Sequence, residues 1–246
     1  MTADHVVVVG GTRGLGRVVA ERFGSAGAAV TVVSRQPPEP SAIPLFGHVA
    51  ADLESPHCAA DIVGRALESG GRIRYLLFCQ RYRGTGDPWQ GELQVSLTAT
   101  KAIIEGFADH FCPDGDRAIG IVSSVYAEFV GGSQPVGYHV AKAGLNQMVR
   151  YFGWTLGRKG IRINAIMPLT YMKPESRDFY LSNQNLLDVY KRFVPLGRLG
   201  DAEDSANLLE FLCSPKAGFI NGQCIFVDGG TSVIWPEELA RSFSGV

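Results

Sequence analysis

Tyr138 and Lys142 stand four residues apart in a segment with helical periodicity, so both side chains are expected on one face of a helix. A free phenol has a pKa of about 10, which is too high for proton exchange at neutral pH. A nearby ammonium group stabilises the phenolate and lowers that pKa, and tyrosine then becomes a usable acid or base. The same spacing is common in helices without catalytic residues, so this interpretation depends on neighbouring groups.

Ser124 is the nearest candidate partner for this pair. The apolar run before Ser123 and Ser124 predicts a strand over residues 118–123. In open parallel sheets, ligands bind at the carboxyl edge, where such a strand ends. We therefore expect Ser124, Tyr138 and Lys142 to converge beside a ligand crevice.

A glycine-rich turn, Gly10-Gly11-Thr12-Arg13-Gly14-Leu15-Gly16, lies between the first predicted strand and the first predicted helix. Gly10 permits the sharp turn, Gly14 lets the backbone approach a pyrophosphate, and Gly16 allows the helix to pack closely on the strand. The helix N-terminus then offers free N–H groups and the positive end of its dipole to a phosphate. The placement favours a dinucleotide site over a plain tight turn.

The residues after the second predicted strand bear on the choice of dinucleotide. NAD-binding folds usually place an acidic residue about 20 residues after the glycines, where it binds the ribose 2′-hydroxyl. This chain has Ser34 and Arg35 there, and Arg13 within the turn itself. Two guanidinium groups and no carboxylate favour a 2′-phosphate, and hence NADP, unless both arginines are merely solvated. Asp52, followed by Leu53, either contacts the adenine ring or caps the next turn.

Short apolar runs alternate with longer helical stretches along the chain. Strands are expected over residues 6–9, 29–33, 46–50, 73–79, 118–123, 161–166 and 223–227. Helices are expected over residues 17–23, 56–68, 91–111, 138–158 and 202–212. This alternation predicts an α/β fold of the Rossmann type, with a doubly wound, parallel sheet of about seven strands and helices on both faces. We expect one domain over residues 1–246, with a long irregular insertion at about 169–195 that covers the substrate.

Composition excludes several classes of protein. With 46% hydrophobic and 19% charged residues the chain can fill a core, and a net charge of −1 gives no basic field for nucleic acid. No apolar run approaches the roughly 18 residues of a membrane span, and the N-terminus has no secretory pattern. The five cysteines form no CxxC pair and have no metal-ligand spacing. We expect a cytoplasmic protein with reduced thiols and no bound metal.

Together these residues resemble the short-chain dehydrogenase/reductase family in its compact single-domain form. The resemblance covers nearly the whole chain, through residues 10–16, Asp52, Ser124, Tyr138 and Lys142, and residues 162–168, 195–200 and 221–230. It implies that Tyr138 exchanges a proton with the substrate, that Lys142 binds the nicotinamide ribose and tunes Tyr138, and that Ser124 holds the substrate oxygen. Hydride then moves between the nicotinamide and a carbonyl or carbinol carbon. The expected cofactor contacts are Gly10, Thr12, Arg13, Gly14, Leu15, Gly16, Ser34, Arg35, Asp52, Leu53, Cys79, Gln80, Tyr138, Lys142, Pro168 and Tyr171.

Two segments depart from the family's pattern. After the fourth strand the family usually has Asn-Asn-Ala-Gly, where this chain has Cys79-Gln80-Arg81-Tyr82-Arg83. Many members also have an Asn in the next helix that holds a proton-relay water, and the matching position here is Ser96. These departures favour an alternative function, a nucleotide-binding sensor or subunit with weak or no turnover.

Arg81, Tyr82 and Arg83 are the candidate substrate residues. The arginines either bind a carboxylate or phosphate on the substrate while Tyr82 packs against its body, or they face solvent or an adjoining subunit. We interpret the chain as an NADPH-dependent oxidoreductase that acts on a carbonyl or secondary alcohol of a small polar or anionic metabolite. The helices at 91–111 and 138–158 are expected to form a homodimer or homotetramer interface, as their counterparts do in the family.

Overall fold

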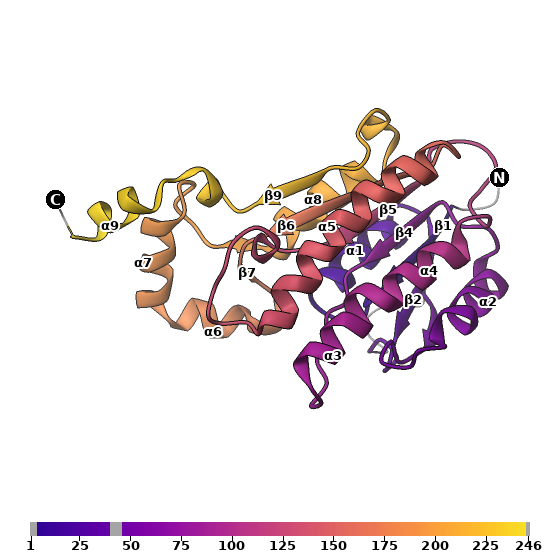
Figure 1. Ribbon diagram of the computed structural model, residues 1–246, viewed down its shortest axis with the longest axis horizontal. Helices are drawn as coiled ribbons and strands as arrows, with labels where there is room; N and C mark the ends of the chain where they lie inside the picture. The colour runs from indigo at the N-terminus through magenta and orange to yellow at the C-terminus, as the bar shows by residue number, and fades with distance from the viewer. Residues whose placement is uncertain (1–3, 40–45, 245–246) are drawn as a thin grey trace.

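The computed structural model describes residues 4–39 and 46–244. Within this part of the chain, seven parallel strands form one sheet in the order β3-β2-β1-β4-β5-β6-β9 (Figure 1). The strands are β1 (His5–Val9), β2 (Ala29–Ser34), β3 (Phe46–Ala50), β4 (Tyr75–Phe78), β5 (Ala118–Val122), β6 (Arg162–Pro168) and β9 (Cys224–Val227). The predicted Rossmann-type α/β fold is therefore confirmed.

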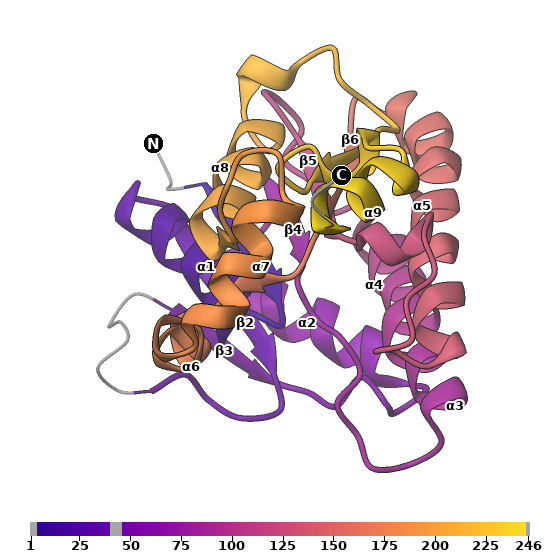
Figure 2. The same ribbon diagram turned by 90° about the vertical axis from the view of Figure 1, so that its left-hand side faces the viewer.

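Helices cover both faces of this sheet (Figure 2). On one face, α2 (Cys58–Gly70), α4 (Ala99–Phe107) and α5 (Val136–Gly157) pack over a cluster that includes Ile62, Ile103 and Phe152. On the other face, α1 (Gly14–Ser25) and α8 (Ala202–Leu212) contact each other and cover a second cluster that includes Val18 and Leu209. Because the central strands are covered twice, Val6 to Val9 are all fully buried, which explains their uninterrupted apolar sequence.

The order of the strands places a crevice between β1 and β4. The chain winds from β1 to β2 and β3 on one side, then returns to β4 on the other side of β1. Val9 pairs in register with Val33 of β2 and with Phe78 of β4. The next residues, Gly10 and Cys79 among them, therefore leave the same carboxyl edge together, where ligands bind in sheets of this topology.

The predicted long helix at 91–111 is confirmed as one unbroken helical segment, but its bounds are Pro88 and Phe107 and part of it is π-helical. It consists of α3 (Pro88–Glu92), a π-helical stretch (Leu93–Thr98) and α4. At the end of the π-helical stretch the Ala99 N–H donates to the carbonyl of Gln94, five residues earlier. This wider turn changes which side chains face inward, and such turns often occur at functional sites.

The insertion at 169–195 is not irregular, contrary to prediction. It contains β7 (Tyr171–Met172), which pairs with β8 (Gly200–Asp201), and the helices α6 (Arg177–Ser182) and α7 (Gln184–Phe193). These helices lie at one end of the molecule, near the C-terminal helix α9 (Pro236–Ser244) (Figure 1). The apolar spacing within residues 186–193 was a signal for α7. Among the described helices, none combines the length and apolar character needed to cross a membrane.

Candidate active site

The turn between β1 and α1 has the conformation that its glycines predict. Gly10 has a φ of +79°, and a Cβ there would lie 2.7 Å from the backbone nitrogen of Gln80. A Cβ at Gly16 would overlap the carbonyl oxygen of Gly10. Gly14 has a φ of +54°, and its N–H donates a 2.6 Å hydrogen bond to the carboxylate of Glu175. The first turn of α1 therefore accommodates an anion, as the phosphates of a dinucleotide require.

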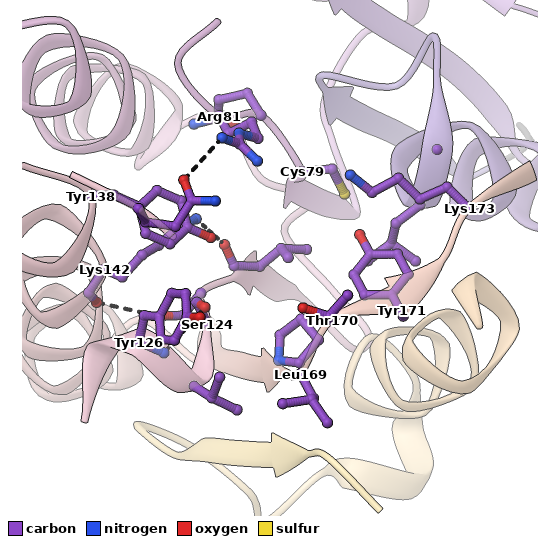
Figure 3. Close-up of a pocket in the computed structure, with 18 of the residues that line it drawn as sticks. Cys79, Arg81, Ser124, Tyr126, Tyr138, Lys142, Leu169, Thr170, Tyr171 and Lys173 are labelled. Carbon is purple, nitrogen blue, oxygen red and sulfur yellow. Dashed lines mark hydrogen bonds between the residues drawn. The ribbon is translucent and has the colours of Figure 1, made fainter. Parts of the chain in front are cut away.

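A cavity of about 540 Å³ opens beside this turn (Figure 3). It extends from the glycine turn, past the ends of β4 and β5, to α5 and the start of the insertion. The predicted site residues that line it are Arg13, Gly14, Leu15, Cys79, Gln80, Arg81, Arg83, Ser124, Tyr138, Lys142, Pro168 and Tyr171. The three residues predicted to be catalytic therefore share one cavity with the glycine turn.

Gln80 lines this cavity and carries a buried acceptor without a partner in the part of the chain that the structure describes. Its Nε2 donates to the Thr100 hydroxyl at 2.8 Å, while its buried Oε1 has no hydrogen-bond partner among the described residues. Buried polar atoms are rarely left unpaired in folded proteins. The start of α1 at Gly14 and the Lys142 ammonium line the same cavity and offer donors to phosphate and ribose oxygens, so the residues present fit a nucleotide cofactor.

Ser124 follows the end of β5 and begins a short 3-10 turn, Val125–Ala127. Its Oγ accepts a hydrogen bond from the N–H of Tyr126 at 3.2 Å, and its own hydroxyl proton can be donated to the Tyr138 oxygen beside it or to a substrate. The preceding Ser123 donates from its hydroxyl to the carbonyl of Lys142 at 3.2 Å. Sequence reasoning did not assign a role to Ser123, whose bond fastens α5 to the end of β5.

Two cations flank the ring of Tyr138. The Lys142 ammonium and the Arg81 guanidinium each lie 5.5 Å from its centroid (Figure 3). Lys142 also donates to the carbonyl of Val122 at 2.8 Å, and its residue is only 2% exposed. An ammonium group has three donors, so two remain for other partners.

Burial dominates the protonation of this pair. Burial lowers the pKa of Lys142 to about 8, although the negative charge of Glu92 acts in the opposite direction. Burial raises the pKa of Tyr138, while a hydrogen bond from Ser124 and the charge of Arg81 act to lower it. The expectation that the pKa of Tyr138 lies below its ordinary value is therefore wrong for this structure, and Arg81 supplies the cationic charge that most opposes the rise.

Several predicted cofactor residues lie outside the cavity lining. Arg35 is exposed and pairs with Glu54 at 3.5 Å, and the Ser34 hydroxyl donates to the carbonyl of Gln36. Asp52 accepts from the N–H of Glu54 at 3.0 Å, which is the turn-capping alternative. The others outside the lining are Gly10, Thr12, Gly16 and Leu53.

Tyr82 does not face the substrate region, contrary to prediction. It is 7% exposed and does not line the cavity. Its ring occupies the space that side chains at Gly84 and Gly91 would fill. Because these glycines leave room for a ring against α3, Tyr82 packs into the protein while its neighbours Arg81 and Arg83 reach the cavity.

Other lining residues come from parts of the chain that carry no recognisable motif. Lys173 and Glu175 reach the cavity from the insertion, and Tyr126 and Gln134 from the loop before α5. The Arg81 guanidinium donates to the Gln134 side chain at 3.3 Å. These residues meet only through folding, so sequence spacing gave no signal for them.

Comparisons with known proteins agree with this geometry. A family model described as "Enoyl-(Acyl carrier protein) reductase" matches residues 9–232, from the end of β1 to beyond β9. An L-rhamnose 1-dehydrogenase (NAD(P)(+)) of Sphingomonas sp. (strain SKA58) is 27% identical over 244 residues, covering 93% of this chain and 96% of the relative. The 3-oxoacyl-(acyl-carrier-protein) reductase FabG of Aquifex aeolicus (strain VF5) is 28% identical over 243 residues, covering 91% and 95%.

A solved structure shows the same architecture. The aldohexose dehydrogenase of Thermoplasma acidophilum, in ligand-free form, superimposes with a TM-score of 0.84 at 23% identity and covers 96% of each chain. At this identity the likeness establishes the fold alone. The family match extends over most of the chain and includes the glycine turn and the Ser124, Tyr138 and Lys142 positions. The chain therefore belongs to the short-chain dehydrogenase/reductase family and is an oxidoreductase that uses a nicotinamide cofactor.

Proposed function

We propose that this enzyme uses NADPH to reduce the carbonyl group of a small anionic metabolite, or catalyses the reverse oxidation, through Ser124, Tyr138 and Lys142. The observation that carries the proposal is the cavity that these three side chains share with the glycine turn and with Arg81 and Arg83. One hydroxyl, one phenol and one buried ammonium lie together where the sheet topology favours a dinucleotide.

Each of the three catalytic residues has a separate role in the proton transfer. When bound, the nicotinamide supplies the hydride in reduction. Ser124 donates a hydrogen bond to the substrate oxygen and keeps its proton, and Tyr138 transfers its phenolic proton to that oxygen while a C–H bond forms at the carbonyl carbon. Lys142 stabilises the phenolate that remains and uses its unoccupied donors to hold the ribose. Tyr138 then regains a proton from solvent, so the carbonyl has gained one hydride and one proton.

The preference for NADPH is proposed from Arg13 and Arg35. Arg13 lines the cavity, and Arg35 follows β2 at the edge where the adenosine ribose is expected. Arg35 pairs with Glu54, but both partners are exposed, and such pairs contribute little in water. A 2′-phosphate would offer Arg35 a more highly charged partner.

An anionic substrate is proposed from the charges of the cavity. Five of its lining residues are cationic, namely Arg13, Arg81, Arg83, Lys142 and Lys173, whereas one, Glu175, is acidic. Burial lowers the pKa of Lys173, and the like charges of Arg83 and Arg81 lower it further. An anion bound among these groups would relieve that repulsion, and a carboxylate or phosphate pairs well with guanidinium.

Single-turnover oxidation of NADPH, followed by the loss of its absorbance, tests this function. The panel pairs oxo acids and phosphorylated ketones with their neutral esters or unphosphorylated analogues. We expect turnover of an anionic member and a loss of at least about 100-fold in Tyr138→Phe, with NADPH binding retained. NADPH binding without turnover on any carbonyl compound would instead favour the sensor or subunit alternative.

Self-association through α5 is a separate proposal. This helix exposes the side chains of Val140, Tyr151 and Trp154. Apolar patches of this kind often mark protein–protein contacts. Light scattering on the eluted protein measures its mass, and Trp154→Glu should shift a dimer or tetramer towards monomer.

A further inference from the structure

Glu92 is a buried carboxylate that the proposed mechanism does not use. It is the last residue of α3 and is 2% exposed. The Ser96 hydroxyl, one turn further on, donates to its Oε2 at 3.2 Å. Burial raises the pKa of Glu92, while the bond from Ser96 and the charges of Lys142 and Arg81 act to lower it. Ionised carboxylates are costly to bury unless hydrogen bonds and opposite charges offset the loss of hydration.

Two glycines bring the Glu92 region close to the catalytic helix. A Cβ at Gly137 would lie 3.0 Å from the carbonyl oxygen of Pro88, and a Cβ at Gly144 would lie 3.0 Å from the side chain of Leu97. Pro88 begins α3, and Leu97 belongs to the π-helical stretch. The two glycines of α5 let the Pro88 backbone and the Leu97 side chain approach this helix closely. Glu92 lies between these two residues in the sequence, so it is packed beside the part of α5 that carries Tyr138 and Lys142.

The charges around this contact come from several elements. Lys142 and Tyr138 belong to α5, whereas Arg81 and Cys79 belong to the segment after β4. After burial itself, Glu92 has the largest effect on the pKa of Lys142, which it raises, whereas Arg81 lowers it and Cys79 raises it. Glu92 also raises the pKa of Tyr138, which Arg81 lowers. The buried ammonium is therefore stabilised by one anion and opposed by one cation.

We propose that Glu92 is a positioning residue that serves as the counter-charge of Lys142. The negative charge of Glu92 keeps the buried ammonium protonated beside Tyr138, and the Ser96 hydroxyl holds the carboxylate within the widened helical turn. This inference rests on the proposed roles of Tyr138 and Lys142. It assigns to Ser96 the function of holding an acidic residue, so the π-helical stretch would support the active site without lining it.

The pH dependence of kcat/KM for carbonyl reduction tests the inference. Reduction needs protonated Tyr138 and protonated Lys142, so activity falls at the alkaline limb when either group loses its proton. Glu92→Gln removes the charge that raises both pKa values, and the limb should move to lower pH by about half a unit or more. Glu92→Met should move the alkaline limb by the same amount without burying an unpaired amide. It therefore replaces Glu92→Gln in this test if that variant folds poorly.

Two further variants separate charge from structure. Glu92→Asp keeps the negative charge and should leave the limb nearer to its original position than Glu92→Gln does. Glu105→Gln is the matched control, because it removes one carboxylate from the exposed side of the neighbouring α4, where Glu105 pairs with Lys101.

The outcomes distinguish this inference from the proposed function. The counter-charge role would be overturned if the alkaline limb stayed at the same pH in both Glu92→Gln and Glu92→Met. If Lys142→Ala were inactive in the same assay, the proposed function would still stand. An equal shift of the limb in Glu105→Gln would also overturn the counter-charge role, because the shift would then depend on the net charge of the protein and not on Glu92. Full activity in Lys142→Ala and Tyr138→Phe would instead contradict the proposed function itself.

Discussion

The backbone N–H of Gly14 donates a 2.6 Å hydrogen bond to the carboxylate of Glu175, which lies 161 residues further along the chain. Gly14 opens α1, whose N-terminus carries the positive end of the helix dipole. Glu175 belongs to the short turn after β7, beside Lys173. An anionic side chain of the insertion therefore binds the same N–H that the phosphates of the proposed cofactor would use.

Glu175→Gln should tighten the binding of NADPH. The substitution removes a negative charge that competes with the pyrophosphate for the start of α1 and repels it. A gain of about 0.5–1.4 kcal/mol, or roughly two- to tenfold in Kd, is the size expected for a charge at a helix N-terminus. Fluorescence titration of NADPH measures it. The control is Glu68→Gln, which removes an equal charge from the exposed part of α2. Weaker binding in Glu175→Gln would show that the carboxylate assists the cofactor.

The preference for NADPH over NADH should depend on Arg13 and Arg35, which come after β1 and β2 at the carboxyl edge of the sheet. NADPH should bind at least about tenfold more tightly than NADH, which corresponds to about 1.4 kcal/mol. The ratio should shrink in Arg35→Ala and at high salt. It should grow slightly in Glu54→Gln, because that change frees Arg35 from its ion pair. Arg65→Ala, at an exposed site on α2, is the control. Equal affinities for the two cofactors in the unmodified protein would contradict the NADP assignment.

Lys142→Met should stabilise the protein at neutral pH while it abolishes activity. The pKa of Lys142 in the folded protein is about 8, below its ordinary value of 10.5. Between these values the unfolded chain binds more protons, so the stability of the unmodified protein rises with pH across that window. Below it, the native state holds a buried ammonium, and removing the charge should add about 1–3 kcal/mol, less the effects of the lost bond to Val122 and of the Glu92 carboxylate left without its opposite charge.

Urea denaturation of Lys142→Met at about pH 7 and about pH 9.5 checks the sign of this effect. The free energy of unfolding of the variant should exceed that of the unmodified protein by less at the higher pH, because the unmodified protein loses its buried charge there. Lys159→Met, at an exposed site, should show no such narrowing. A constant advantage at both pH values would mean that packing, and not charge, accounts for the change.

The sequence predicted those parts of the site whose chemistry is local. The glycine turn needs particular backbone angles at Gly10 and Gly14, so its residues specify it directly. Tyr138 and Lys142 share a helix face because their spacing matches one turn. The sheet followed from alternating apolar runs, because buried parallel strands have uninterrupted apolar sequences.

The remaining features depend on contacts between distant segments. Glu175 bonds to Gly14, and α3, which ends at Glu92, packs on α5, although the segments in each pair are distant in the sequence. One extra residue in the turn at Leu93–Thr98 hardly alters an apolar periodicity of 3.6, so the π-helical stretch left no clear pattern. The orientation of Tyr82 was set by Gly84 and Gly91, which leave a ring-sized space but have no distinctive spacing.

Substitutions at residues 81–83 should therefore have two different effects, one on substrate binding and one on stability. Arg81 and Arg83 line the cavity, whereas Tyr82 fills a space in the protein. Arg81→Met with Arg83→Met should raise KM for an anionic substrate by about tenfold or more, the effect of losing a charge-assisted hydrogen bond of about 1.5 kcal/mol. KM for a neutral analogue of similar size should stay nearly unchanged.

Tyr82→Ala should instead lower stability by about 3 kcal/mol, because it empties a packed space, and should leave charge selectivity intact. Thermal unfolding and the ratio of kcat/KM for the charged and neutral substrates measure the two effects independently. Tyr82→Phe keeps the ring and should leave that ratio unchanged. If the double arginine variant keeps its KM for the charged substrate, Arg81 and Arg83 do not bind its anion, and the cationic cavity serves the cofactor alone.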